Sequence, residues 1–347
     1  MKTMTTTMTA TPVSRRQLLK GGLGAALGFG LAAASLPLPG NDATKVGAAI
    51  PTLSSPVIVG GPAPKLIPIY STPSPVIVLG PAPKLIPVAV PFTAYHGVTG
   101  AEHQSRFNAL GPTGYRMISL SISGSPDDPR YAAVWVQRAG AAQRAVHGVT
   151  AAQYQQWFDA GVADGFVPTI VSATGPAAAA RFAAVAEQGI TGPWVARHTI
   201  DADAYDFQLV LATSNNLIPR SVAIYGDSSA RRFTGVWHHD PRGIGWPSVT
   251  DVTAAQYQQS FDVLMSHGYR PRYLAVAGDG QMAAVFGDDD IGTWIARHNL
   301  TSAQYQQAFL EYTGNDMVPV CVQAGGVGSA TRYAAIFVTQ AAVGLYC

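Results

Sequence analysis

The chain has 347 residues and a formal net charge of +2 at pH 7, and only 12% of its residues are charged. A net charge this small excludes a protein that binds nucleic acid through a clustered basic surface, because that mode of binding depends on many contacts with phosphate groups. The two cysteines, Cys321 and Cys347, are too few for a disulfide framework, although they leave room for one disulfide outside the cytoplasm.

Residues 1–40 read as an export signal. Arg15 and Arg16 form a twin-arginine motif within residues 14–20, and a mildly apolar run of Gly, Ala and Leu follows in residues 21–38. A membrane anchor is the alternative, but the Gly and Ala content favours a removable signal peptide. We therefore expect export by the twin-arginine pathway to a secreted, periplasmic or cell-envelope location. The only expected membrane contact is through the signal peptide during export.

Residues 41–91 form a proline-rich linker with an internal repeat. The segment 55–68 returns as the segment 74–87, a spacing of 19 residues. Proline fixes φ and removes a hydrogen-bond donor, which disfavours a packed domain here. The segment is expected to be an extended spacer. The alternative is a docking segment whose Val-Ile-Val and Lys-Leu-Ile stretches add a strand to a partner.

From residue 92 onward one motif returns five times. Its clearest copies are the segments 149–158, 252–261 and 300–309, and degenerate copies start at residues 98 and 200. The Thr or Asp of each copy follows the previous one by 51, 51, 52 and 48 residues. A constant period of this size predicts repeated supersecondary units that bury their apolar faces against their neighbours.

Each copy predicts the start of a helix. Thr150 with Gln153 fits a capping box, and Val149 with Tyr154 fits a hydrophobic staple around it. Apolar residues then recur at a spacing of four, while Gln155 and the residue after it fall outside this stripe and are expected to be solvated. Glycine and then proline end each predicted helix.

Two predicted strands follow each helix, and the second of them mostly opens with Arg. Turn residues lie between them, so a hairpin is expected. A linker such as residues 194–198 leads to the next helix. The sequence thus predicts an α+β repeat protein of five linker–helix–hairpin units, bounded at 92–143, 144–193, 194–245, 246–293 and 294–347. The apolar tail at 341–346 favours a closed or nearly closed toroid, and an open solenoid is the alternative.

The motifs Trp-x-Ala-Arg-His, Thr-x-Ala-Gln-Tyr-Gln-Gln-x-Phe and Arg-Tyr-Ala-Ala-Ile-Phe resemble the bacterial tandem repeat of polyglycine hydrolases across residues 92–340. The resemblance implies an α+β repeat domain that recognises a protein substrate beside a β-lactamase-like serine hydrolase domain. The Ser-x-x-Lys motif of such a hydrolase does not occur in this sequence. No catalytic residue carries over, so we expect a module without enzymatic activity and without a cofactor.

Two sets of side chains are candidates for binding. The first set is the histidines at equivalent linker positions: His96, His147, His198 and His298. They are weak candidates for a metal site if the units close around an axis. The favoured interpretation is that each histidine bonds to backbone at the helix start. The adjacent His238, His239 and Asp240 are a weaker candidate. Strand arginines with two tryptophans suit a recognition surface: Arg130, Arg181, Arg232, Arg332, Trp135 and Trp237. Structural ion pairs, or stacking on Tyr and Trp, are the favoured role for the arginines.

Together these features predict an exported, non-catalytic repeat module that binds an extracellular protein or peptide. A serine hydrolase or peptidase whose residues come from different repeats is one alternative. A structural cell-surface protein tethered by the proline-rich segment is the other.

Overall fold

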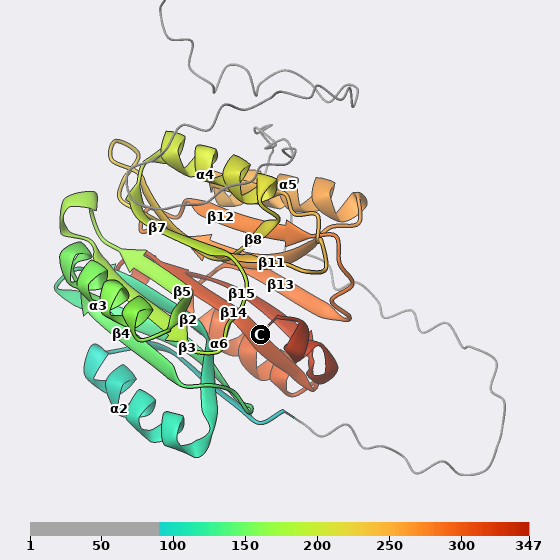
Figure 1. Ribbon diagram of the computed structural model, residues 1–347. Helices are drawn as coiled ribbons and strands as arrows, with labels where there is room; N and C mark the ends of the chain where they lie inside the picture. Colours follow the sequence, from blue (N-terminus) through green and yellow to red (C-terminus); the bar gives the residue numbers. More distant parts are fainter. Residues whose placement is uncertain (1–89, 347) are drawn as a thin grey trace, which may run out of the picture.

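The computed structural model describes residues 90–346 (Figure 1). The expected signal peptide (1–40) and all but the last two residues of the proline-rich linker (41–91) lie outside this range. Within it, no helix combines the length and apolar character needed to cross a membrane.

Five units share the order strand, helix, strand, strand. The first contains β1 (Phe92–Val98), α2 (Gly100–Leu110), β2 (Tyr115–Ser125) and β3 (Asp128–Gln137). The second contains β4 (Gln143–Val149), α3 (Ala151–Ala163), β5 (Val167–Thr174) and β6 (Arg181–Glu187). The third contains β7 (Trp194–Ile200), α4 (Ala202–Ser214), β8 (Leu217–Tyr225) and β9 (Arg232–His239). The fourth contains β10 (Ser248–Val252), α5 (Ala254–Ser266), β11 (Arg270–Val276) and β12 (Met282–Gly287). The fifth contains β13 (Trp294–Leu300), α6 (Ser302–Thr313), β14 (Met317–Gly325) and β15 (Arg332–Thr339), and a 3₁₀ helix, η4 (Gln340–Leu345), follows it.

The helix starts follow the predicted capping chemistry. Thr99, Thr150, Thr253 and Thr301 each form a complete capping box with the residue at N3. Asp201 accepts a hydrogen bond from the Ala204 amide, and Ala204 has no side chain to return one. These bonds satisfy amides that the first helical turn cannot satisfy itself, so each helix begins at a fixed residue.

Each unit folds into an antiparallel three-stranded sheet in which the last strand lies in the middle. The predicted hairpin is present, but the predicted linker is itself a strand. For example, Val195 of β7 pairs with Trp237 of β9. The linker was not recognised as a strand because its pairing is interrupted by a β-bulge in all five units, which breaks the alternation of side chains. In each bulge the second residue has positive φ, and in three units it is not glycine: Thr199, Asp251 and Asn299.

The second strand of each unit faces the centre of the array. We call these five strands the inner strands: β2, β5, β8, β11 and β14. Figure 1 shows α2, α3, α4 and α5 along the outside, with the inner strands between them. Side-chain hydroxyls join neighbouring inner strands to each other. Ser221 of β8 accepts from the Val171 amide of β5 at 3.0 Å and donates to the Val171 carbonyl at 3.0 Å. Each such pair satisfies buried backbone groups that no sheet partner reaches.

The same kind of contact joins the fifth unit to the first. Ser119 of β2 accepts from the Val322 amide of β14 at 2.9 Å and donates to the Val322 carbonyl at 3.3 Å. Ser121 does the same two residues further along, with the Ala324 amide at 2.9 Å. The Gly124 amide then donates to the Gly326 carbonyl at 3.0 Å. Each unit therefore contacts two neighbours, and the order of contacts is cyclic.

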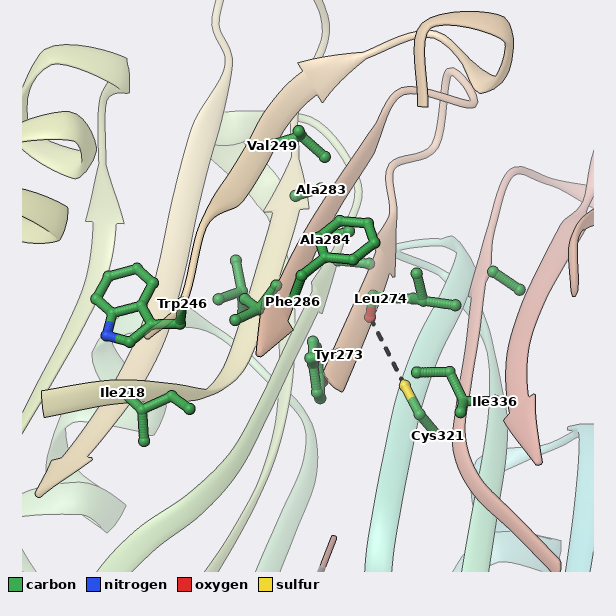
Figure 2. Close-up of a cluster of buried hydrophobic side chains, with 14 of the residues drawn as sticks. Ile218, Trp246, Val249, Tyr273, Leu274, Ala283, Ala284, Phe286, Cys321 and Ile336 are labelled. Atoms are coloured by element: carbon green, nitrogen blue, oxygen red, sulfur yellow. Dashed lines mark hydrogen bonds between the residues drawn. The ribbon is translucent and has the colours of Figure 1, made fainter. Parts of the chain in front are cut away.

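The buried apolar residues of the described chain form four clusters, and each cluster draws residues from more than one unit. The largest buried cluster draws residues from the third, fourth and fifth units, among them Ile218, Tyr273 and Ile336 (Figure 2). In Figure 2 the Cys321 thiol points at the Leu274 carbonyl of the neighbouring inner strand, 3.9 Å away. This position in the fifth unit corresponds to Ser119 and Ser221 in the first and third, so the thiol replaces the hydroxyl of those units.

Candidate ligand-binding site at the centre of the repeat array

Every inner strand carries a β-bulge at the same point, directly after its proline or, in β2, after Met117. The register with the middle strand slips there by one residue in all five units. A bulge leaves one residue unpaired and re-aims its side chain. The residues at these five equivalent positions are Ile118, Thr169, Arg220, Arg272 and Val320.

All five bulge residues line one pocket of about 370 Å³, which we call the axial pocket. Its wall also includes residues at the far ends of the middle strands, such as Arg138, Glu187 and His238, and it reaches Tyr346 after η4. The volume falls in the usual range for small-molecule and peptide side-chain sites. A pocket to which every unit contributes one equivalent residue is a direct product of the repeated bulge.

Ion pairs fix the charged rim of the axial pocket. Arg138 pairs with Glu187 at 3.2 Å, and so links the first unit to the second. Arg242 pairs with Asp240 at 3.0 Å. Asp289 accepts from Arg272 at 3.0 Å and from Arg242 at 3.4 Å. Because the Arg272 and Asp289 side chains are mostly buried, their pairing holds the guanidinium in one position.

The C-terminal tail lies against this rim. Arg272 donates to the Leu345 carbonyl at 2.8 Å, and its guanidinium lies 4.8 Å from the centroid of the Tyr346 ring. The Tyr346 hydroxyl donates to the Pro271 carbonyl at 2.9 Å. The tail is thus buried in part, with Ala342 and Val343 both 3% exposed. One side of the axial pocket is therefore built by the end of the chain.

Two titratable groups in the pocket are electrically neutral near pH 7. Burial, and to a smaller extent the charge of Arg220, lower the pKa of His238 to about 4. Its Nε2 lies 2.7 Å from the Pro168 carbonyl, to which it donates as the neutral tautomer. Burial raises the pKa of the Cys321 thiol to about 12, so this thiol is not a nucleophile near neutral pH. Cys347, its expected partner in a disulfide, lies outside the described residues.

The strand arginines lie at the other end of the sheets. Arg181 pairs in register with Thr174, the last residue of its inner strand, and Arg232 with Tyr225 in the same way. Three of them bind groups close in the sequence: Arg130 binds Asp128, Arg232 the Arg231 carbonyl and Arg332 the Ser329 carbonyl. Arg181 donates to the Pro126 carbonyl in the turn of the preceding unit. These contacts shape the turns of the hairpins.

The two tryptophans do not form part of a surface, which corrects the sequence prediction. Trp135 and Trp237 are both 0% exposed. The Trp135 indole donates to the Tyr95 hydroxyl at 3.2 Å. The middle strand is covered on both sides, so aromatic residues on it join the interior of the array.

The four linker histidines lie at the boundaries between units. Each Nε2 bonds the side-chain amide oxygen of a helix glutamine in the preceding unit: His147 with Gln104, His198 with Gln155, His298 with Gln258 and, across the cyclic contact, His96 with Gln306. The histidines are therefore spread around the array. Within residues 90–346 no three His, Cys, Asp or Glu side chains are grouped as metal ligands. Of the glutamines expected to be solvated, Gln155 and Gln258 are part-buried at these boundaries, whereas Gln156 and Gln306 are exposed as expected.

At the boundary before the fourth unit, the histidine and the glutamine are both replaced by other residues. Thr250 stands where the other units have histidine, and Asp206 of the preceding helix stands where the others have glutamine. Ring contacts accompany the hydrogen bonds: His298 lies 4.8 Å from Tyr257 and His198 lies 5.2 Å from Tyr154, centroid to centroid. At four of the five boundaries a histidine of the strand bulge thus contacts a glutamine of the neighbouring helix.

The axial pocket was missed by sequence reasoning. Pro168, Pro219, Pro271 and Pro319 were noticed only as residues that stop helices, whereas each also marks the position just before a bulge. The residue after each proline varies strongly between units that are otherwise alike, and that variation is the signal that could have identified the site.

A family model described as the polyglycine hydrolase-like structural repeat matches the chain five times, over residues 89–138, 140–189, 191–240, 243–286 and 291–340. The matches cover well over half of the chain. The chain belongs to this family. Each match corresponds to one strand–helix–strand–strand unit of this chain. The expected family and α+β repeat class are thereby confirmed.

Proposed function

We propose that the protein is an exported, non-catalytic recognition module that binds an extracellular protein or peptide in the axial pocket. The observation that carries this proposal is the convergence of five equivalent bulge residues on one pocket. A scaffold that repeats while the residue at one position varies is suited to recognition, because contact chemistry changes without changing the backbone.

The chemistry of the pocket suits a peptide. Arginine and tyrosine are favoured at sites that carry binding energy, and Arg220, Tyr273 and Tyr346 all line the pocket. Aliphatic neighbours such as Ile118 and Ile170 offer apolar surface beside them.

A serine hydrolase is the main alternative, and the two serines that directly follow bulge residues of the axial pocket argue against it. Ser119 and Ser221 are buried and hold the backbone of the neighbouring inner strand, so neither is placed as a nucleophile. Treatment with a serine-directed phosphonate distinguishes the two functions. Stoichiometric labelling of one serine would establish the hydrolase instead.

A peptide-display selection against the full chain tests recognition. Selected peptides are re-measured on Ile118→Trp, which fills the axial pocket, and on Leu310→Ala, which alters an exposed residue of α6. Recognition in the pocket requires that Ile118→Trp abolish binding and that Leu310→Ala leave it intact. Failure to select any peptide, or equal binding to both variants, would contradict the proposal. Circular dichroism establishes that both variants fold.

Export is tested separately. Replacing Arg15 and Arg16 together by lysine keeps the charge but removes the twin-arginine motif, and the protein is then expected to stay in the cytoplasm. Deleting residues 51–90 tests the tethering alternative. If the protein is a structural part of the cell surface, that deletion releases it into the medium, whereas a recognition module fractionates as before.

A further inference from the structure

A contact between aromatic rings recurs at the boundaries between units. An aromatic residue at the start of a linker strand packs edge-on against a phenylalanine of the preceding helix. The three ring pairs have centroids 6.0–6.4 Å apart and planes at 70–74°: Phe158 with Trp194, Phe261 with Trp294 and, across the cyclic contact, Phe309 with Phe92. After the third unit, Trp246 lies in the same buried cluster as Leu209 of the preceding helix. Four boundaries thus place an aromatic residue at this position.

The boundary between the first and second units has glutamine there instead. Gln143 lies seven residues before Thr150, as Trp194 lies seven residues before Asp201. Its side chain is bound to the inner strand of the first unit. The Gln143 Oε1 accepts from the Met117 amide at 2.9 Å, and its Nε2 donates to the Met117 carbonyl at 3.0 Å. No ring of the linker strand therefore packs on Phe107, the helix residue of this boundary.

The residue before the inner-strand bulge explains the exchange. Met117 stands where the other four inner strands have proline: Pro168, Pro219, Pro271 and Pro319. Proline has no amide hydrogen, whereas the amide of the buried Met117 requires an acceptor. Gln143 supplies that acceptor. Methionine with glutamine thus replaces proline with an aromatic residue, and the two positions change together.

A pocket of about 350 Å³ lies at this boundary, and we call it the boundary pocket. Phe107 and Gln143, whose equivalents elsewhere hold the ring pair, both line it. Tyr115 adds a half-buried ring to the wall, and Trp135 packs against Phe107 with centroids 5.6 Å apart. Among the residues that the structure describes, none lines both this pocket and the axial pocket. The boundary pocket is therefore a separate site with mainly aromatic walls.

The remaining lining residues suit a flat ring carried on a chain. Arg116 contributes a guanidinium that donates to the Tyr115 carbonyl at 3.1 Å and to the Gly140 carbonyl at 3.3 Å. A cation fixed beside an aromatic face attracts it. Three lining residues are exposed: Asn108, Pro112 and Ala142. A chain that carries the ring can leave the pocket on this exposed side.

We infer that the boundary pocket binds the indole ring of a tryptophan residue on a peptide or protein ligand. The ring would take the place beside Phe107 that Trp194 takes beside Phe158. Aromatic pairs of this geometry are stabilised beyond the area that they bury. The inference adds a second site to the protein and does not depend on what the axial pocket binds.

Two capped tripeptides test the ligand chemistry. Isothermal titration calorimetry with the full chain compares acetyl-Gly-Trp-Gly-amide with acetyl-Gly-Leu-Gly-amide. The tryptophan peptide is expected to bind roughly tenfold more tightly or better, because leucine offers less area and no ring. Equal binding of the two peptides, or no binding of either, would overturn the inference.

A paired variant tests the location of the site. Met117→Pro combined with Gln143→Trp gives this boundary the two residue types found between the second and third units, Pro168 and Trp194. The new indole should fill the pocket and abolish binding of the tryptophan peptide. Both changes are needed, because Gln143→Trp alone would leave the Met117 amide without its acceptor. Undiminished binding to the folded paired variant would overturn the inference.

Ala142→Trp provides a second test that leaves Met117 and Gln143 as they are. It narrows the pocket from its exposed side and should weaken the tryptophan peptide by a factor of roughly ten or more. Gln156→Trp is the matched control, since it adds the same indole at an exposed position of α3 that lines neither pocket. Equal effects of these two variants would place the peptide elsewhere and overturn the inference. Circular dichroism establishes that each variant folds, and if the paired variant does not, Ala142→Trp decides the question. Peptides selected on the axial pocket remain a separate test, because Ile118→Trp changes the other site.

Discussion

At the scale of single residues, the helix caps were predictable because every group involved lies within four residues in the sequence. Thr253 accepts from the Gln256 amide, and the Gln256 side chain accepts from the Thr253 amide. Such local chemistry has a sequence signature. The contacts of Gln155 and its copies have no such signature, because their histidine partners lie 40 to 210 residues away in the sequence.

The caps give a first prediction. Thr253→Ala should lower the free energy of unfolding by about 0.5–2 kcal/mol, since it leaves an amide of the first turn without its acceptor. Asp201→Ala should cost the same or less, because Ala204 makes the capping box one-sided there. Chemical denaturation of the two variants checks the order. A larger loss for Asp201→Ala would show that the reciprocal glutamine contributes nothing.

The boundary histidines give a prediction for pH. Burial lowers the pKa of His298 to about 4, with Asp262 opposing the shift. Between about pH 6.5 and pH 4, His298 is therefore protonated in the unfolded chain and neutral in the folded chain. The free energy of unfolding is thus highest above about pH 6.5 and falls as the pH drops toward 4. His298→Gln should flatten this loss by on the order of 2 kcal/mol between about pH 7 and pH 4. Denaturation curves of both proteins over that range are the measurement, and parallel pH profiles would refute the assignment. His198→Gln should act in the same direction, because burial also lowers the pKa of His198.

At the scale of elements, the helices and hairpins were predictable and the bulges were not. A bulge is defined by the register between two strands, and neither strand contains that register by itself. This is why the linker strands and the axial pocket escaped sequence reasoning together. In the linker strands and in the inner strands alike, one strand has one residue more than its partner. In β1, for example, His96 and Gly97 lie between the paired residues Tyr95 and Val98, where the partner strand has a single residue.

Coupling between elements of different units gives the third prediction. Tyr257 of α5 is 1% exposed and contacts Phe286 of its own unit and His298 of the next. Tyr257→Ala should therefore lower the free energy of unfolding by on the order of 3–5 kcal/mol, as for other buried aromatic residues. Hydrogen exchange should show deprotection in the fifth unit as well as the fourth. Deprotection confined to the fourth unit would mean that the units fold independently.

At the scale of the whole molecule, the period of the sequence predicted repeated units, and the apolar tail favoured closure over an open stack. What the sequence could not supply was the contact between the first and fifth units. Ser119 and Val322 lie 203 positions apart, yet they make the same bonds as Ser221 and Val171. Nothing in either segment alone distinguishes a contact within the array from one that joins its two ends.

That equivalence gives the last prediction. Ser221→Ala leaves the buried Val171 amide without an acceptor, and the loss in free energy of unfolding should be about 1–3 kcal/mol. Ser119→Ala should cost as much if the first and fifth units hold each other as internal neighbours do. Thermal unfolding of the two variants side by side is the measurement. A negligible loss for Ser119→Ala alongside a clear loss for Ser221→Ala would show that the array is open in solution.

The repeated inner-strand bulge has a further consequence for how such a protein can change. The five bulge positions together determine the chemistry of the pocket wall. A single substitution can change the side chain at one of them while the backbone conformation stays the same. The inner-strand backbone carries arginine at this position in the third and fourth units and valine in the fifth, so the bulge itself does not require one kind of side chain. Ile118, Thr169 and Arg220 are only half-buried, so selection can change the pocket at these three positions with less effect on packing than at the buried Arg272 and Val320.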